Sequence, residues 1–390
     1  MNRDDKQIRI LGKGVTALAL KDRFPNALLY DDSDFDKYDL NSNELTVVSP
    51  GIPPFNKMVK ESNNLVSDYD LFYDEMPLSV WITGTNGKTT TTQMCQHILQ
   101  EYDSVCGGNI GTPLSHLDNK KKIWILETSS FTLHYTNKAK PNIFILLPIS
   151  EDHISWHGTF DEYKQAKLKP LKLMEENDIA IIPKEFENID TNAHKIVYKN
   201  SDDLCKEFNI NKEGLVFKEP FLLDSILALA TKKILFDEVD YEMINSFVID
   251  KHKVEEFFDS KKRLWIDDSK ATNIDATINA LTPYRKKDIH IILGGDDKGA
   301  NLRPLFESIK ELNIYVYAIG TNTDKIFDYC NEYEIAVKKC NILKNAVELI
   351  DKNLTNDSLG ILSPAAASLD QYKSYSHRGE EFKKLVSYLR

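Results

Sequence analysis

Residues 80–90 decide the fold, and they read VWITGTNGKTT. The apolar and β-branched start of this stretch predicts a buried strand, and the glycines that follow predict a tight turn into a helix. Glycines let the backbone pass close to a polyphosphate, while successive N–H groups and the helix N-terminus face the anion. Lys88 adds a positive charge, and Thr89 adds a hydroxyl for magnesium. The stretch therefore predicts a phosphate-binding loop, with ATP as the expected nucleotide.

The spacing of this loop is shorter than that of the common phosphate-loop motif. Ile82 stands where G-x-x-x-x-G-K-T has its first glycine, so the chain has only G-x-x-G-K-T. An ordinary strand-to-helix turn is the alternative, but Gly-Lys-Thr directly after a strand is rare by chance. The residues expected to hold the nucleotide here are Gly84, Thr85, Asn86, Gly87, Lys88, Thr89 and Thr90.

Two further apolar runs lead into residues that could bind a metal ion. Residues 123–126 end at Glu127, and residues 143–147 precede a segment that ends at His153. In an open parallel sheet, the carboxyl ends of neighbouring strands line one crevice, which is also where the phosphate loop lies. Glu127 suits magnesium, and a charge directly after a buried strand needs a partner. Imidazole is an unusual magnesium ligand, so a polar helix start is an equally good interpretation of His153.

Length and composition limit the classes of protein to consider. The 390 residues predict two or three domains, and 42% hydrophobic with 28% charged residues is the balance of a soluble globular protein. The net charge of -11 argues against nucleic acid or an anionic membrane as a partner. Five scattered cysteines predict a reducing cytoplasm without structural zinc. No apolar run approaches the ~18 residues of a membrane span, so we expect neither export nor membrane insertion.

Short apolar runs alternate with longer mixed-period segments, and this β-then-α rhythm predicts parallel sheets. The runs are 8–11, 45–48, 80–83, 123–126, 143–147, 179–182, 289–293, 315–319 and 359–362. The first run enters a glycine turn at 12–16, and residues 28–30 end in Asp31, which resembles half of a dinucleotide-type fold. G-x-G alone is a weak signal, so a plain strand-to-helix turn stays open there. We expect domain boundaries near 77 and near 250.

A set of segments spread over almost the whole chain resembles the Mur ligases of bacterial peptidoglycan synthesis. They are GTNGKTT at 84–90, GNIGTP at 108–113, ETSSF at 127–131, EDH at 151–153, DSKATN at 268–273, GGDDK at 294–298 and LSPAAAS at 362–368. The last segment, continued by Asp370-Gln371 and Arg378-Gly379, resembles the D-glutamate-adding branch. The resemblance implies an α/β fold of three domains. These are a Rossmann-like UDP-sugar domain (1–77), a central P-loop ATPase domain with a mostly parallel sheet (78–250) and a Rossmann-like amino-acid domain (251–390).

The resemblance also implies the reaction. An ATP-dependent ligase would add D-glutamate to UDP-N-acetylmuramoyl-L-alanine, a step of cell-wall synthesis that serves cell shape and division. The substrate carboxylate would attack the γ-phosphate to give an acyl phosphate, and the amine of D-glutamate would then displace phosphate. Two anions must meet, so catalysis should be mostly charge neutralisation and positioning. We expect a cytoplasmic monomer with small-molecule substrates.

The resemblance assigns the catalytic and metal-binding roles to a few side chains. Thr89 and Glu127 would hold a magnesium ion that bridges the ATP phosphates. His153 and a carbamylated Lys167 would hold a second ion, and Lys88 would complete the catalytic set. By its sequence alone, Lys167 is one of several helix lysines, and a solvated helix face is the better interpretation.

Further roles follow for the nucleotide and the two substrates. Asn273 would meet the adenine, and Asp296 with Lys298 would approach the phosphates when the domains close. Lys253 replaces an arginine of the family, so the two-point fork is lost. The residues expected at the D-glutamate are Ser368, Leu369 and Tyr375, with core packing as the alternative for the last two. Those expected at the UDP-sugar are Val15, Thr16, Asp31, Gly51 and Asn109, and Asp32-Ser33 stands where an arginine is expected.

Three alternatives remain open on the sequence. A sister ligase would share the ATPase centre and use another amino-acid acceptor. A nucleotide-binding switch protein would need the phosphate loop but not Glu127, His153 and Lys167 in register. A P-loop kinase would be expected to carry the longer glycine loop.

Overall fold

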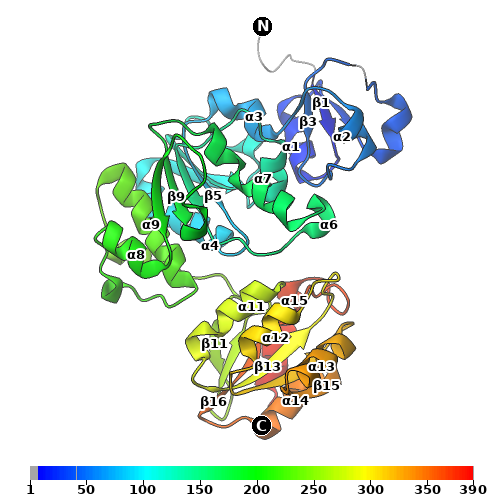
Figure 1. The fold of residues 1–390 in the computed structure, drawn as a ribbon, viewed down its shortest axis with the longest axis vertical. Coiled ribbons are helices and arrows are strands. Elements are labelled where there is room, and N and C mark those ends of the chain that lie inside the picture. Colours follow the sequence, from blue (N-terminus) through cyan, green and yellow to red (C-terminus); the bar gives the residue numbers. More distant parts are fainter. Residues whose placement is uncertain (1–7, 41, 390) are drawn as a thin grey trace. The chain divides into compact units, whose positions relative to one another are not determined.

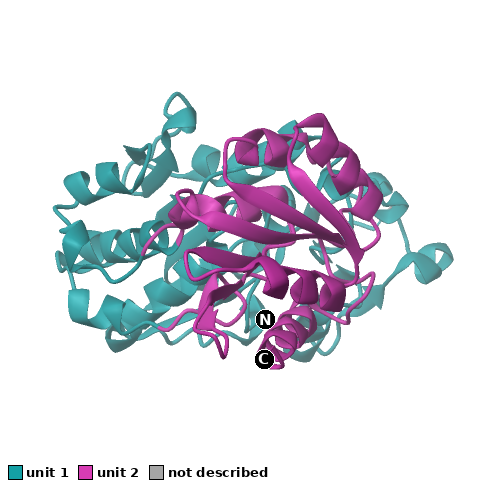
Figure 2. Ribbon diagram, turned by 90° about the horizontal axis from the view of Figure 1, so that it is seen from below, with its two compact units in different colours: residues 1–217, 221–247 teal, residues 218–220, 248–390 magenta. Residues whose placement is uncertain are grey.

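The computed structural model describes residues 8–40 and 42–389, which fold into two compact α/β units. Unit 1 comprises residues 1–217 and 221–247, and unit 2 comprises residues 218–220 and 248–390, coloured teal and magenta in Figure 2. The described residues build three sheets, and residues 1–7 of the expected first domain lie outside them. The boundaries expected near 77 and 250 stay predictions.

Unit 1 contains two parallel sheets, with strand orders β2-β1-β3-β4 and β10-β9-β8-β5-β7-β6 (Figure 1). Its strands are β1 (Arg9–Leu11), β2 (Leu28–Tyr30), β3 (Thr46–Val48), β4 (Leu65–Val66), β5 (Leu78–Thr83), β6 (Ser104–Gly108), β7 (Ile123–Glu127), β8 (Ile143–Leu146), β9 (Ile179–Pro183) and β10 (His194–Tyr198). Its helices are α1 (Val15–Arg23), α2 (Lys57–Glu61), α3 (Asp68–Phe72), α4 (Lys88–Leu99), α5 (Ser130–Tyr135), α6 (Ile154–His157), α7 (Phe160–Leu173), α8 (Ser201–Glu207), α9 (Phe221–Phe236) and α10 (Tyr241–Asn245).

The larger sheet of unit 1 is buried on both faces because its strands are apolar throughout. Trp81 and alternate residues of the neighbouring strands pack with α5 and α7 on one face. Val80 and Ile82 pack with α4, α8 and α9 on the other face. All six strands of this sheet are parallel, so their carboxyl ends lie along one edge.

Unit 2 holds one sheet of strand order β11-β12-β16-β13-β14-β15, in which only the β11–β12 pair is antiparallel among the described residues. Its strands are β11 (Glu255–Phe258), β12 (Leu264–Asp267), β13 (Asp288–Gly294), β14 (Ile314–Ile319), β15 (Ala336–Asn341) and β16 (Ser358–Leu362). Its helices are α11 (Ile274–Leu281), α12 (Arg303–Ile309), α13 (Thr323–Glu332), α14 (Leu343–Asn353) and α15 (Tyr375–Ser387). Helices α11, α12 and α13 pack on one face of the sheet, and α14 and α15 pack on the other.

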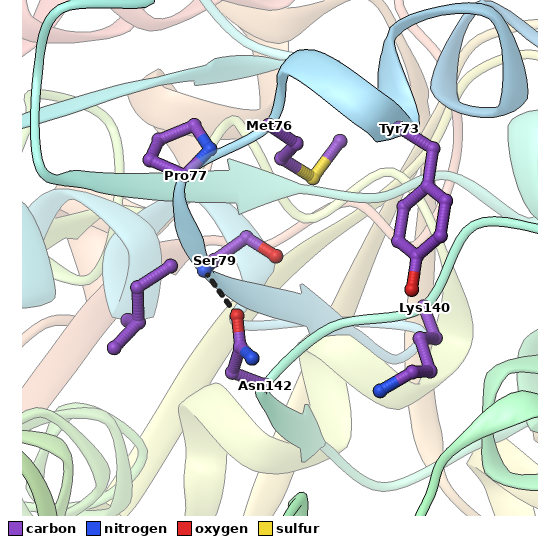
Figure 3. A pocket seen from close by; sticks show the side chains of 7 residues that line it. Tyr73, Met76, Pro77, Ser79, Lys140 and Asn142 are labelled. Atoms are coloured by element: carbon purple, nitrogen blue, oxygen red, sulfur yellow. Dashed lines mark hydrogen bonds between the residues drawn. The ribbon is translucent and has the colours of Figure 1, made fainter.

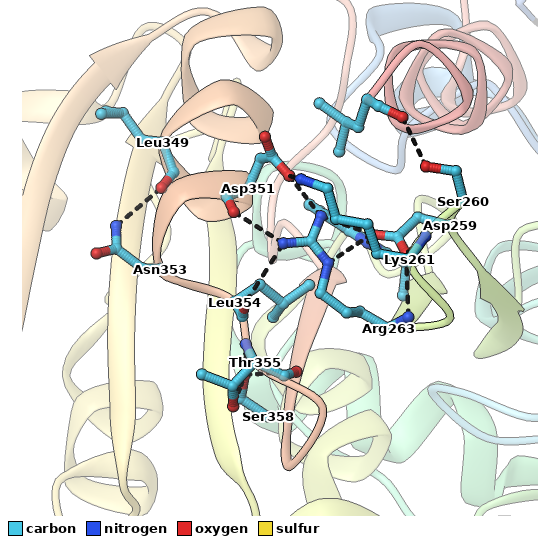
Figure 4. Close-up of polar contacts among 12 residues, drawn as sticks. Asp259, Ser260, Lys261, Arg263, Leu349, Asp351, Asn353, Leu354, Thr355 and Ser358 are labelled. Carbon is cyan, nitrogen blue, oxygen red and sulfur yellow. Dashed lines mark hydrogen bonds and ion pairs between the residues drawn. The ribbon is translucent and has the colours of Figure 1, made fainter.

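A buried arginine fixes the amino end of the unit 2 sheet (Figure 4). Arg263 donates from Nε to Asp259 Oδ2 at 2.8 Å and from Nη1 to the Asp351 carbonyl at 2.8 Å. The same Nη1 reaches the Leu354 carbonyl at 3.3 Å, and Nη2 pairs with the Asp351 carboxylate. The guanidinium therefore ties the β11–β12 turn to the end of α14.

Every apolar run that the sequence predicts as a strand is a strand, with bounds that shift by one or two residues. The prediction of parallel sheets is confirmed, apart from the single antiparallel edge strand β11. The glycine turn at 12–16 enters α1, as expected. Among residues 8–40 and 42–389, no helix combines the length and the apolar character that a membrane crossing requires.

Candidate active site

The phosphate loop joins β5 to α4 through two glycines with positive φ. Gly84 has φ 147°, and a Cβ on it would lie 2.5 Å from Leu147 Cβ, so no side chain fits. Gly87 has φ 87° and caps α4 without any side-chain hydrogen bond. The N–H groups of the first turn of α4 thus begin at a glycine, which is the local geometry that binds phosphate.

Lys88 folds back over this turn. Its Nζ donates to the carbonyl oxygens of Gly84 at 2.9 Å and of Thr85 at 2.7 Å. Thr85 is anchored in turn, because its hydroxyl accepts the Ser150 N–H at 2.9 Å and lies 3.0 Å from the Tyr163 hydroxyl. The ammonium group of Lys88 therefore lies against the backbone of the loop itself.

Glu127 collects the polar side chains at the carboxyl edge of the sheet. It ends β7 and is 2% exposed. Its Oε2 accepts the Thr89 hydroxyl at 2.8 Å, and its Oε1 accepts the Asn109 amide at 2.6 Å. The expectation that Glu127 lies beside the phosphate loop is met. Carboxylate, hydroxyl and amide oxygens are the donors that a hard cation such as Mg²⁺ prefers.

Lys167 is buried rather than solvated, contrary to the interpretation of its sequence context alone. It is 1% exposed on α7, and its Nζ donates to the Gly84 carbonyl at 2.8 Å and to the Thr83 hydroxyl at 3.4 Å. Burial, and then the nearby charge of Lys88, lower the pKa of Lys167 well below its ordinary value. The amine is thus placed beside the loop in an environment that favours its neutral form.

His153 lies at the start of α6 in a left-handed conformation, with φ 55°. Its ring contacts Phe131 at 4.8 Å between centroids, and its Nε2 lies 3.7 Å from Asp152 Oδ2. The side chain is exposed. It remains a candidate ligand on the same side of the sheet as Glu127, because α6 follows the carboxyl end of β8.

Four of the five residues expected at the UDP-sugar lie at one edge of the smaller sheet of unit 1. Val15 begins α1 and is 74% exposed, with Thr16 beside it. Asp31 follows β2, and Gly51 follows β3 and is also exposed. Because β1, β2 and β3 are parallel, these positions share one edge. Asn109 instead contacts Glu127 at the larger sheet of unit 1.

Lys13 sets the charge of this edge. Its Nζ lies 2.8 Å from both Asp31 Oδ2 and Asp34 Oδ2. The hydrogen bond from Lys13 lowers the pKa of Asp31 to about 2. A lysine shared between two carboxylates leaves this turn with no surplus positive charge.

The candidate residues of unit 2 lie on loops around its sheet. Asn273 caps α11 and accepts the Ala276 N–H, and Asp296 pairs through its backbone with Ala367. Lys298 is exposed, with φ 50°. The three expected D-glutamate residues differ in burial: Ser368 is buried, Tyr375 is half-buried and Leu369 is 67% exposed.

Sequence reasoning missed two contributors to the nucleotide loop. Tyr163 is 1% exposed and places its hydroxyl on Thr85, while Lys167 Nζ lies 4.8 Å from its ring centroid. Asp224 on α9 accepts the Thr91 hydroxyl at 2.6 Å. The available signal for Asp224 was a lone acidic residue within an apolar helical run.

A pocket in unit 1 lies away from this chemistry (Figure 3). It has a volume of about 380 Å³, and Tyr73, Met76, Ser79, Lys140 and Asn142 are among its lining residues. These residues surround the amino end of β5, whereas the phosphate loop follows the carboxyl end. The pocket therefore lies at the opposite edge of the sheet from the candidate active site.

Comparison with known proteins places this geometry in a family. The Mur ligase middle domain family matches residues 82–217. The UDP-N-acetylmuramoylalanine–D-glutamate ligase of Campylobacter jejuni strain 81-176 is 53% identical over 367 residues, which cover 94% of this chain and 90% of that protein. The ligase of the same name from Helicobacter pylori strain J99 is 41% identical over 422 residues, which cover 97% of this chain and 99% of that protein.

Two solved structures share the three-domain α/β architecture. MurF ligase from Thermotoga maritima, in complex with ADP, has a TM-score of 0.59 at 15% identity and covers 99% of this chain and 98% of its own. UDP-N-acetylmuramate-alanine ligase MurC from the same organism has a TM-score of 0.56 at 15% identity, with coverage of 97% and 98%. Together with the identity to the curated ligases, the loop geometry leads to one assignment: the chain belongs to the Mur ligase family, among the UDP-N-acetylmuramoylalanine–D-glutamate ligases.

Proposed function

We propose that the chain joins D-glutamate to UDP-N-acetylmuramoyl-L-alanine at the expense of ATP, through an acyl phosphate. The observation that carries this proposal is a cluster at the carboxyl edge of the larger sheet of unit 1. There Lys88, Thr89 and Glu127 surround the start of α4. Relatives named for this reaction, at 53% and 41% identity, support D-glutamate over the acceptors of sister ligases. A kinase or a switch protein would need fewer of these groups.

The loop binds and orients the triphosphate in this proposal. Backbone N–H groups from Gly84 to Thr90 hold the phosphates, and Lys88 Nζ leaves its carbonyl partners to neutralise a phosphoryl oxygen. The carboxylate of the muramoyl-alanine then attacks the γ-phosphorus, and ADP leaves. The amine nitrogen of D-glutamate next attacks the acyl carbon, and orthophosphate leaves with the bridging oxygen.

The oxygen donors beside the loop fit magnesium. Glu127 and Thr89 would hold one ion, and His153 with a modified Lys167 would hold a second. Bound magnesium would neutralise phosphate charge and so lower the barrier to attack by another anion. Hydrogen bonds from Thr89 and Asn109 already hold the Glu127 carboxylate in place for such an ion.

Carbamylation of Lys167 is supported by its burial. A neutral amine nitrogen can attack CO2, forming an N–C bond and releasing a proton, and the product carbamate is an anion with oxygen ligands. The lowered pKa of Lys167 raises the fraction of neutral amine that is available for this attack. An ammonium in this place would repel a cation.

The outer parts of the substrates are assigned to the loops already described. Val15, Thr16, Asp31 and Gly51 would contact the UDP-sugar, with Asn109 nearer the reacting end. Ser368, Leu369 and Tyr375 would receive D-glutamate. Asn273, Asp296 and Lys298 at the nucleotide, a monomeric state and a cytoplasmic location stay predictions.

The test measures phosphate release with and without the UDP-sugar, using D-glutamate, L-glutamate and D-alanine as acceptors. We expect release that requires ATP, the UDP-sugar and D-glutamate together. With the alanine carboxylate labelled with ¹⁸O, one labelled oxygen should appear in orthophosphate. Absence of label in the orthophosphate would contradict an acyl phosphate, and equal rates with another acceptor would contradict the assignment of D-glutamate.

A further inference from the structure

A buried carboxylate outside the expected site lies against the phosphate loop. Asp224 belongs to α9, which reads FLLDSILALATKKILF, and it is 4% exposed. Placing a carboxylate in such an apolar environment is costly unless hydrogen bonds compensate for lost water. Its contacts therefore indicate what it stabilises.

Asp224 lies beside both ends of the turn that starts α4. Its Oδ1 accepts the Thr91 hydroxyl at 2.6 Å, and a Cβ on Gly87 would lie 2.9 Å from the same oxygen. Thr91 closes the first helical turn, since its N–H donates to the Gly87 carbonyl at 2.9 Å. Its hydroxyl also lies 3.1 Å from that carbonyl. One carboxylate oxygen thus bonds Thr91 at one end of the turn 87–91 and fills the space beside Gly87 at the other end.

A negative charge on Asp224 suits this location, although Asp224 itself does not act as a phosphate ligand. The N-terminus of α4 carries partial positive charge, which stabilises a nearby anion. A carboxylate would repel phosphate if it faced it directly. Its hydrogen bond to Thr91 and its position beside Gly87 instead constrain the backbone whose N–H groups would face the phosphates.

We propose that Asp224 is a positioning residue for ATP, acting through Thr91 and Gly87 on the phosphate loop. The inference rests on the proposed ATP-dependent ligase function and extends it to a residue on α9. It predicts an effect that is specific to the nucleotide. Binding of D-glutamate should be almost indifferent to the same change.

The experiment compares Asp224→Ala, Asp224→Asn and Thr91→Val in the full-length ligase. We expect Asp224→Ala to raise the KM for ATP and the Kd for ADP about tenfold, because a buried hydrogen bond to a charged group is lost. The KM for D-glutamate should stay within about twofold. Asp224→Asn keeps an acceptor oxygen and should recover most of the loss, whereas Thr91→Val should resemble Asp224→Ala.

Thr231→Val is the matched control. Thr231 and Cys95 make another buried polar contact between the same helices, at 3.8 Å and one turn further along α4. This variant should lower the Tm without changing the KM for ATP. If Asp224→Ala does the same, Asp224 only packs and the proposal is overturned.

The remaining outcomes also decide the question. If Asp224→Asn is as impaired as Asp224→Ala while Thr91→Val is normal, the charge acts alone, and the positioning route is wrong. If Asp224→Ala does not fold, Thr91→Val decides by its KM for ATP. If the wild-type protein forms no D-glutamyl amide, the proposed function itself is contradicted. If the wild type is active and Asp224→Ala has the same KM for ATP, only the proposal for Asp224 is contradicted.

Discussion

Two glycine turns of unit 1 share a plan and differ in what surrounds them. Each follows a parallel strand and enters a helix, and each contains a glycine with positive φ, Gly12 at 114° and Gly84 at 147°. Each also carries a lysine, Lys13 in one and Lys88 in the other. The local sequence pattern therefore does not separate their functions.

Buried polar support separates them. The phosphate loop, which is the second of these turns, is supported by Glu127, Lys167 and Asp224, each at most 4% exposed. At the first turn, Lys13 has 46% of its side chain exposed and is shared by two carboxylates, and Val15 is 74% exposed. Buried polar groups thus support the turn that we propose binds phosphate, whereas the first turn carries exposed side chains.

Exchanging each lysine for alanine gives the largest expected difference between the turns. Lys88→Ala should lower kcat/KM by roughly 10²–10³-fold, since a group that stabilises developing charge is lost. Lys13→Ala should change only the KM of the UDP-sugar, by a few fold, because its charge is already shared. Steady-state phosphate release checks both, and equal losses would show that the two turns work alike.

Removal of Lys167 tests the buried support of the phosphate loop. Lys167→Ala should lose roughly a hundredfold in kcat, and short carboxylic acids that replace the carbamate should restore part of it. Removal of bicarbonate should inactivate the wild type but not the rescued variant. Normal activity of Lys167→Ala, or an unchanged rate without bicarbonate, would argue against the modification.

The same residue predicts a pH dependence of stability. The pKa of Lys167 in the folded state is lower than its ordinary value of 10.5. At pH values between the folded pKa and 10.5, the unfolded chain therefore binds more protons than the folded chain. The free energy of unfolding should therefore rise with pH across that window. Lys167→Met should remove this slope, as urea unfolding at several pH values in the absence of CO2 would show.

Alanine at the glycines gives a smaller, structural effect. Gly84→Ala should destabilise unit 1 by roughly 1–3 kcal/mol, because φ 147° is strained for an L-residue and Leu147 fills the space. Gly14 has φ -80° and nothing within 4 Å of an added Cβ, so Gly14→Ala should stay within about 1 kcal/mol. Urea unfolding compares the two.

The smallest effect concerns the charges of the first turn. In Lys13→Met the pKa of Asp31 should rise from about 2 toward its ordinary 3.8. Since the folded pKa is lowered, the pairing stabilises the fold above pH ~4 and is lost as the pH falls toward 2. Carboxyl NMR titration measures this shift, and Lys37→Met is the control, because Lys37 lies 3.7 Å from Asp34 and, within residues 8–40 and 42–389, forms no ion pair with Asp31.

The sequence was informative where function and local pattern coincide. Residues 80–90 predicted the strand, the turn and the helix. The rule that the carboxyl ends of parallel strands line one crevice predicted that Glu127 would lie near this turn, and the family resemblance paired it with Thr89. Burial across long sequence separation could not be predicted. Asp224 lies 133 residues from Thr91, and a lysine such as Lys167 looks solvated until the fold encloses it. Weakly apolar strands, such as β6 with its glycines and the exposed edge strand β15, also lacked a pattern.

The Arg263 contacts have a consequence for the dynamics of unit 2. They hold the amino ends of β12 and β16, whereas the Ser363–Ser368 segment leaves the carboxyl end of β16. Amide hydrogens of β12 and β16 should therefore exchange slowly, and so should those of the buried residues 363–368, whereas exchange should be faster around Leu369, which is 67% exposed. A stiff amino end would keep the register of β12 and β16 while the exposed segment around Leu369 moves.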